Sequence, residues 1–246
     1  RSLLILYKSI FQLNMKIYDC FMFFDEEMLL DLRLNIMDKY VDKFVITEAT
    51  YMHSGKPKKL SFDIGKFKNF KDKIIYIVVN EQPKDLLKIN SYDDDDTKQK
   101  KMTDNAKKRE MYQINKATEG LKDASADDII LISDLDEIPN LENLNFEKIN
   151  KKIFFFKQKM YYYKLNLLYE SFDWYGSKAC KKKHLSSPEN LRSSKNKSYS
   201  FWRLDVLFSK IKHNSVYFVN NGGWHFTRVL TPEEIHQIGL DDGVPE

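Results

Sequence analysis

Cysteine, proline, glycine and arginine are all scarce in this chain of 246 residues. It contains two Cys, six Pro and eight Gly, while 42% of its residues are hydrophobic. That balance excludes collagen-like, low-complexity and wholly disordered chains. Two cysteines, Cys20 and Cys180, cannot build a disulfide framework, and they lack the spacing of a zinc site. They fit a reducing compartment, with a single disulfide as the alternative.

Long apolar runs are missing too. No stretch reaches the roughly 18 uninterrupted apolar residues that a membrane-spanning helix needs, so we expect a soluble globular protein or the soluble part of a larger one. The formal net charge is +4, but the basic residues are interleaved with 36 acidic ones and only six are arginine. Base recognition and bidentate phosphate contacts favour arginine, so the composition argues against nucleic-acid binding.

The N-terminal end differs from the rest of the sequence. Residues 1–14 have some apolar character, but they show neither a long apolar segment nor a small-residue cleavage site. We interpret them as a leader outside the fold, and the alternative is a truncated signal anchor. Residues 15–246 are expected to form a single domain.

Strand and helix signals alternate from Lys16 onward. The strand signals fall at residues 17–24, 41–48, 74–79 and 129–133. Asp25 is placed to cap a helix over 25–40, and a long charged helix is predicted over 100–121. This alternation is typical of an α/β protein with a mainly parallel central sheet and helices on both faces.

The second half is less regular and rich in aromatic residues, with FFF and YYY between residues 153 and 168. We interpret it as the far side of the same sheet plus a region that shapes the substrate site. The charged runs 93–96 and 181–183 are expected to be solvated loops.

The strongest chemical signal follows the last apolar strand. Asp134 and Asp136 are two carboxylates two residues apart, and Glu137 adds a third. Oxygen ligands of this kind suit Mg²⁺ or Mn²⁺, which complete their coordination with phosphate oxygens and water. Ligands of parallel sheets bind beyond the carboxyl ends of the strands, where Glu48 and Asn80 also lie. The sequence therefore predicts a metal–phosphate site, with an ordinary acidic turn as the alternative.

Two further residues have an unusual setting. Arg33 falls among the apolar residues of the helix predicted over 25–40, so its guanidinium needs an acidic partner. We expect a structural ion pair; the alternative is that Arg33 positions a site carboxylate such as Glu48. His225 follows the glycine pair at 222–223, and beside two aspartates it becomes a candidate third metal ligand rather than an ordinary histidine.

Taken together, the segments of this sequence resemble glycosyltransferase family 17, the β-1,4-mannosyl-glycoprotein β-1,4-N-acetylglucosaminyltransferase type. The resemblance runs from Ile17 to about Ile235. It is carried by residues 18–37, 41–62, 128–139, 174–178, 187–192 and 221–226. It implies a GT-A-like fold, UDP-N-acetylglucosamine as donor, a glycan or glycoprotein acceptor, and inversion at the anomeric carbon. Family members continue beyond the point where the resemblance stops, so we expect the domain to be truncated at its C-terminus.

The resemblance, together with the residues themselves, also suggests roles for individual side chains. Asp134 and Asp136 would hold Mn²⁺ or Mg²⁺ against the donor diphosphate, with His225 as the third candidate ligand. The expected donor-binding residues are Arg33, Glu48, His53, Ser54, Lys56 and Asp134. For the base that deprotonates the acceptor hydroxyl, Asp173 is the first candidate, and Glu170 and Glu137 are the alternatives.

Two other function classes stay open at this point. Residues 134–138 superficially fit the D-x-D-x-[TV] pattern of haloacid-dehalogenase-like phosphatases, but Ile138 replaces Thr or Val and the motif lies in mid-chain. The second alternative is a non-catalytic carbohydrate-binding protein. Animal members of family 17 are Golgi membrane proteins; without a convincing anchor here, we expect a cytoplasmic protein, or a Golgi-lumen one that has lost its anchor.

Overall fold

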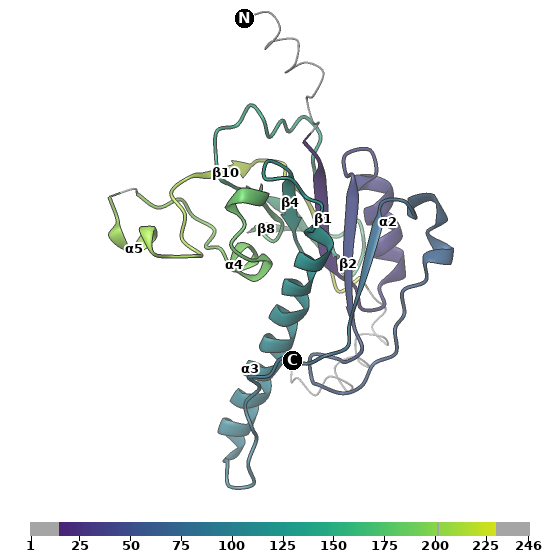
Figure 1. Ribbon diagram of the computed structural model, residues 1–246, viewed down its shortest axis with the longest axis vertical. Helices are drawn as coiled ribbons and strands as arrows, with labels where there is room; N and C mark the ends of the chain where they lie inside the picture. The colour runs from purple at the N-terminus through teal and green to yellow at the C-terminus, as the bar shows by residue number, and fades with distance from the viewer. Residues whose placement is uncertain (1–14, 201, 230–246) are drawn as a thin grey trace, which may run out of the picture.

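A computed structural model describes residues 15–200 and 202–229 (Figure 1). Its strands are β1 (Ile17–Met22), β2 (Lys43–Ala49), β3 (Ile74–Val79), β4 (Ile129–Ile132), β5 (Glu137–Pro139), β6 (Ile153–Phe156), β7 (Gln158–Tyr162), β8 (Leu168–Trp174), β9 (Lys178–Lys181), β10 (Val216–Val219) and β11 (Gly223–Thr227). Its α-helices are α2 (Glu27–Met37), α3 (Asp95–Lys116), α4 (Pro188–Arg192) and α5 (Leu204–Leu207). The predicted leader, residues 1–14, and the sequence beyond Ile235 lie outside the described residues.

The strands form two sheets. The larger has seven strands in the order β10-β6-β9-β4-β1-β2-β3, and the smaller has four in the order β5-β11-β7-β8. The four strands predicted from apolar runs are β1 to β4, within two residues at each end. They lie side by side and pair in parallel, whereas β9 runs antiparallel to both β4 and β6. The prediction of a mixed α/β protein is confirmed.

The order of the parallel strands reverses at β1. The chain moves outward from β1 to β2 and β3, then returns to place β4 on the other side of β1. In sheets of this kind the crevice at such a reversal, beyond the carboxyl ends of the strands, is where ligands bind. Asp134 follows β4 at this edge of the sheet.

Helices α2 and α3 share hydrophobic clusters with different residues of β2. The buried side chains of α2 share one hydrophobic cluster with Phe44 and Ile46. Ile114 of α3 and the 3₁₀ helix that follows it (Ala117–Leu121) share another cluster with Val45. Successive side chains of a strand point to opposite faces, so the two clusters lie on opposite sides of β2.

Both predicted helices differ from expectation at their ends. Asp25 does not cap α2, which begins at Glu27; instead the Glu26 carboxylate accepts the backbone N–H groups of Phe24 and Asp25. The charged helix α3 begins earlier than predicted because the Asp94 carboxylate accepts the N–H of Thr97, as an N-cap does. The acidic run 93–96, expected to be a loop, therefore contains the start of α3.

The basic run 181–183 is not a free loop either. Lys181 ends β9, and the residues after it form a 3₁₀ turn (Lys182–His184). The backbone N–H groups of Lys182 and Lys183 donate to the carbonyl oxygens of Asp128 and Ala126. Backbone hydrogen bonds thus fix a segment whose charges alone predicted a loop.

The two cysteines are separate and buried. Cys20 on β1 and Cys180 on β9 are both free thiols, so the single disulfide left open by the sequence does not form. Burial raises the pKa of the Cys180 thiol to about 12, which keeps it protonated and unreactive. Among the residues described, no helix combines the length and apolar character needed to cross a membrane.

A buried ion pair joins α2 to β1 and to the turn after β4. The Arg33 guanidinium donates from Nε and Nη2 to the two carboxylate oxygens of Asp19, at 2.8 and 2.7 Å, and neither side chain is exposed. Its Nη1 donates to the carbonyl oxygens of Asp134, Leu135 and Glu137, at 2.9 to 3.1 Å. The expected structural ion pair is thus present, and its acidic partner is Asp19 rather than Glu48.

We expect Arg33→Met to lower the free energy of unfolding by about 3–5 kcal/mol, because Asp19 would stay buried without its counter-charge. Urea unfolding followed by circular dichroism measures the loss. The exposed Lys39, just beyond α2, gives the matched control Lys39→Met, which should change stability by less than about 0.5 kcal/mol. A similarly small loss in both variants would contradict a structural role for the pair.

Candidate active site

Four of the predicted site residues converge where β4 ends and the smaller sheet begins. In the antiparallel pairing of β11 with β5, His225 lies opposite Glu137. His225 Nε2 lies 3.2 Å from Asp136 Oδ2, and the backbone N–H of Asp134 donates to Glu137 Oε2 at 2.9 Å. We call Asp134, Asp136, Glu137 and His225 the carboxylate cluster.

Glu137 is the fixed centre of this cluster. Its side chain is wholly buried, and Oε1 accepts a hydrogen bond from Trp174 Nε1 at 2.6 Å. Burial, together with the nearby charge of Asp134, raises the pKa of Glu137 to about 7, although Arg192 acts in the opposite direction. Three donors reach its two oxygens, so Glu137 ties the turn after β4 to Trp174 and to Arg192.

Arg192 belongs to the site and was given no role from the sequence. It is the last residue of α4, and its side chain is only 17% exposed. Its Nη2 forms an ion pair with Asp134 Oδ2 and lies 3.3 Å from Glu137 Oε1. The signal that could have found it is the segment 187–192, which carries part of the family resemblance and holds one of only six arginines.

Glu110 on α3 adds a further carboxylate that sequence reasoning missed. Burial and the charge of Asp134 raise its pKa, while Arg192 acts to lower it. In the sequence, a glutamate in a long charged helix carries no distinguishing pattern, so only the packing of α3 identifies this half-buried residue. The Arg192 guanidinium therefore lies in the field of three carboxylates.

Three buried polar atoms of the site have no hydrogen-bond partner among the residues described. They are Asp134 Oδ1, Arg192 Nε and His225 Nδ1. Buried polar groups almost always have partners, and an unsatisfied one costs about 1–3 kcal/mol. Their concentration in one cluster is the pattern of a binding site whose ligand supplies the missing partners.

An aromatic wall and one glycine shape the cluster. The Trp174 ring stacks on the His225 ring with centroids 4.7 Å apart. A Cβ at Gly176 would lie 1.9 Å from Glu137 Oε1 and 2.3 Å from Trp174 Nε1. The absence of a side chain at Gly176 therefore allows the hydrogen bond between Trp174 and Glu137.

Glu48, expected to lie toward the donor, is wholly buried at the end of β2. Its carboxylate accepts the N–H groups of Ser61 and Phe62, at 2.7 and 3.1 Å, and the hydroxyl of Tyr76 at 2.8 Å. Lys58 forms an ion pair with it. These bonds occupy the carboxylate and hold the loop after β2 against β2 and β3.

The turn that contains His53, Ser54 and Lys56 is fixed to helix α3. Arg109 donates to the carbonyl oxygen of His53 at 3.0 Å, and a Cβ at Gly55 would lie 2.6 Å from the Arg109 guanidinium. Helix α3 therefore positions this turn and carries Glu110 at the carboxylate cluster.

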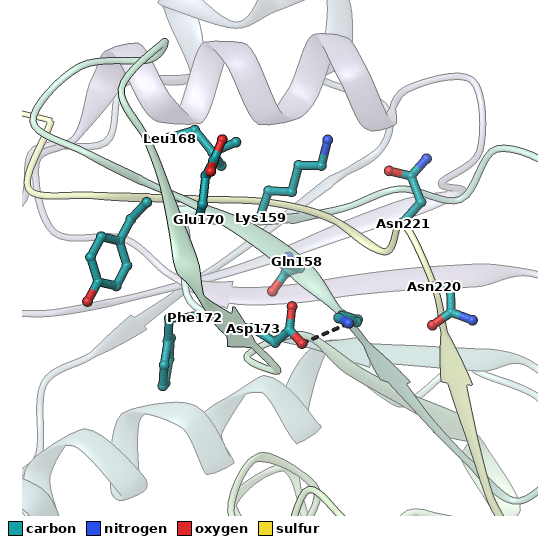
Figure 2. A pocket seen from close by; sticks show the side chains of 10 residues that line it. Gln158, Lys159, Leu168, Glu170, Phe172, Asp173, Asn220 and Asn221 are labelled. Atoms are coloured by element: carbon teal, nitrogen blue, oxygen red, sulfur yellow. Dashed lines mark ion pairs between the residues drawn. The ribbon is translucent and has the colours of Figure 1, made fainter.

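The structure does not bring the other two base candidates to the cluster. Asp173 lies opposite Lys159 in the pairing of β8 with β7, and its side chain forms an ion pair with Lys157 at 2.7 Å. Neighbouring residues of a strand point to opposite faces, so Asp173 points away from the face on which Trp174 contacts Glu137. Glu170 and Asp173 line a pocket beside β7 and β8 to which no residue of the carboxylate cluster contributes (Figure 2). Of the three candidates, only Glu137 lies in the cluster.

We expect Gly176→Ala to destabilise the fold by about 1–3 kcal/mol, because the added Cβ displaces Glu137 and Trp174. Thermal unfolding measures the loss, and tryptophan fluorescence reports the changed surroundings of Trp174. The matched control is Gly65→Ala, whose Cβ would meet only the flexible carboxylate of Asp63. Unchanged stability and fluorescence in Gly176→Ala would contradict the close packing described here.

Comparison with protein-family models matches residues 7–226 to glycosyltransferase family 17. A search of curated proteins finds no match. The matched range contains the parallel strands β1 to β4, Arg192 and the whole carboxylate cluster. The chain therefore belongs to glycosyltransferase family 17 and is a glycosyltransferase.

Proposed function

We propose that this enzyme transfers N-acetylglucosamine from UDP-N-acetylglucosamine to a hydroxyl of a glycan acceptor, with inversion at the anomeric carbon and with a divalent metal ion. The observation that carries the proposal is the convergence of Asp134, Asp136, His225 and Arg192 beside the reversal of strand order, with three unsatisfied buried atoms. The fold proposed with it is of GT-A type, with helices on both faces of the larger sheet. The choice of sugar follows the family resemblance.

The side chains of the carboxylate cluster fit a metal ion that is coordinated partly by the protein and partly by the substrate. No three His, Cys, Asp or Glu side chains in the described part of the chain are placed to hold a metal by themselves. Mg²⁺ and related ions, however, are commonly held by one or two protein ligands together with substrate phosphates and water. Asp136 Oδ2 and His225 Nε2 are 3.2 Å apart, close to the ~3 Å between adjacent ligands of an octahedral ion with ~2.1 Å bonds.

Asp136 and His225 would therefore hold the ion, while Asp134, which is paired with Arg192, is not placed as a third ligand in this arrangement. When bound, the ion supplies positive charge that stabilises the nucleoside diphosphate as it leaves. The chain's own contribution is to fix the two ligands on different elements: Arg33 holds the turn that carries Asp136, and the pairing of β11 with β5 places His225.

Arg192 supplies a second positive charge. Its buried Nε is an unused donor, and guanidinium groups bind phosphate oxygens through strong charge-assisted hydrogen bonds. In the protein without ligand, the Asp134 and Glu137 carboxylates balance its charge. We assign Arg192 to the donor diphosphate.

The carboxylates divide into two groups. Glu137 is wholly buried and cannot touch an acceptor hydroxyl in this arrangement, so it positions Trp174 and the turn after β4. Asp173 and Glu170 line a pocket open to solvent, and they are the carboxylates that an acceptor would meet. Family membership favours this transferase over the phosphatase and over the non-catalytic protein.

Asp136→Asn tests the metal site. We expect the wild-type protein to bind UDP in preference to GDP and CMP when Mn²⁺ is present, and to lose most of this affinity with a chelator. The variant should lose at least about tenfold in Mn²⁺-dependent UDP affinity, and the corresponding Asp136→Ala should abolish transfer, because the ion loses a carboxylate ligand. Calorimetric titration measures the binding, and UDP release with a glycan acceptor measures the transfer.

The exposed Asp95 provides the control variant Asp95→Asn, for which wild-type binding is expected. Folded Asp136→Asn protein that keeps full Mn²⁺-dependent binding would remove the proposed site. Wild-type protein that binds no nucleotide would contradict the donor assignment itself.

Arg192→Gln tests the diphosphate contact. We expect it to weaken UDP binding by about 10- to 100-fold, the range for a lost hydrogen bond to a charged group, and to leave uridine binding unchanged. Arg192→Lys should recover part of the affinity because it keeps the charge. Arg203→Gln, at an exposed arginine paired with Asp205, is the control. Equal losses for UDP and uridine would show that Arg192 acts only on the structure.

A further inference from the structure

A pocket of about 490 Å³ opens between β7, β8 and the turn that joins β10 to β11 (Figure 2). Its volume lies within the roughly 300–1,000 Å³ typical of small-molecule sites. None of its lining residues belongs to the carboxylate cluster, and Arg192 does not line it either. The pocket is therefore separate from the site assigned to the donor.

The charges of this pocket cancel. Two lysines and two acids line it, Lys157 and Lys159 against Glu170 and Asp173. Lys157 and Asp173 form an ion pair at 2.7 Å, and their formal charges neutralise each other. A wall of this kind offers no net attraction to a phosphate or a carboxylate, in contrast to Arg192 at the cluster. The charge balance favours an uncharged ligand.

Two side-chain amides line the pocket. Asn220 and Asn221 lie in the β10–β11 turn, where Gly222 N–H donates to the carbonyl oxygen of Lys157 at 2.7 Å and Lys157 N–H donates to that of Val219 at 3.0 Å. Within the described residues, neither Asn side chain bonds to another group, and Figure 2 shows both at the pocket. An amide offers donors and acceptors together, which is what hydroxyl groups require.

Exposed aromatic rings complete the lining. Tyr169 is 50% exposed and Phe172 is 49% exposed. The face of an aromatic ring carries partial negative charge, and the C–H face of a pyranose packs against it. The Phe172 ring lies 6.0 Å from the Trp174 ring, which stacks in turn on His225. A row of three rings thus leads from the pocket to the carboxylate cluster.

We propose that this pocket binds a neutral saccharide, and that in the transfer reaction it holds the part of the acceptor glycan away from the reacting hydroxyl. Balanced charge, free amides and exposed rings together match a polyhydroxylated, uncharged ligand. The ring row from Phe172 to His225 gives the acceptor chain a path toward the donor. The assignment of the saccharide as acceptor rests on the proposed function; the preference of the pocket for a neutral saccharide does not.

Direct binding of trisaccharides tests the proposal. The probes are the neutral trimers of N-acetylglucosamine, mannose and galactose, and the anionic trimer of galacturonate serves for comparison. Saturation-transfer NMR and calorimetry measure their binding. We expect at least one neutral trimer to bind the wild-type protein more tightly than the anionic one. Its Kd should rise about tenfold in Tyr169→Ala, which removes a stacking ring. It should also rise in Asn221→Gly, a change that suits the positive φ of 52° at that position.

Two control variants separate the two sites. Tyr92→Ala removes a tyrosine that is 84% exposed outside the pocket, and it should leave trisaccharide binding unchanged. Asp136→Asn should lose Mn²⁺-dependent UDP binding while it keeps trisaccharide binding. Tyr169→Ala should bind the trisaccharide more weakly while it keeps Mn²⁺-dependent UDP binding.

The proposal is overturned if no neutral trimer binds, if the galacturonate trimer binds more tightly, or if Tyr169→Ala leaves the Kd unchanged. UDP binding without trisaccharide binding would remove this inference and leave the donor site intact. Trisaccharide binding without UDP binding would support the pocket and contradict the proposed function.

Discussion

The arrangement of the site depends on one buried guanidinium. Arg33 pairs with Asp19 inside the core and also donates hydrogen bonds to three carbonyl oxygens of the turn that follows β4. A turn of this kind points its carbonyl oxygens together, and without a buried donor they would need water. The Arg33 guanidinium takes the place of that water and joins helix α2, strand β1 and the turn into one unit. The carboxylates of Asp134 and Asp136 are therefore presented at the sheet edge by a backbone that the core itself holds.

Around this fixed turn, some buried polar atoms of the site have no hydrogen-bond partner among the described residues. Arg192 lies against Asp134 and Glu137, yet its Nε and the Oδ1 of Asp134 have no partner among the described residues. A core designed only for stability would satisfy these atoms, since each unsatisfied one costs free energy. In the proposed function, the donor diphosphate and the metal ion bind beside these unpaired atoms. The indole N–H of Trp174, by contrast, is satisfied, because it donates to Glu137.

Strand β8 separates two chemical environments. On one face Trp174 contacts the carboxylate cluster, which is charged and largely buried; on the other, Asp173 and Lys157 line an open pocket of balanced charge. Asp173 and Trp174 are neighbours on β8, and the register shift in its pairing with β7 interrupts the simple alternation of side chains farther along the strand.

Local pattern determined much of this protein. Continuous apolar runs predicted β1 to β4 because buried parallel strands require them, and the polar residues just after β4 predicted where the acidic site would lie. The sequence also indicated that Arg33 needs an acidic partner, since its helix position is apolar. Only the tertiary structure decided that the partner is Asp19, that Arg192 joins the cluster, and that Asp173 points away from it. These facts depend on strand register and on contacts between residues far apart in the chain, and no local pattern encodes either.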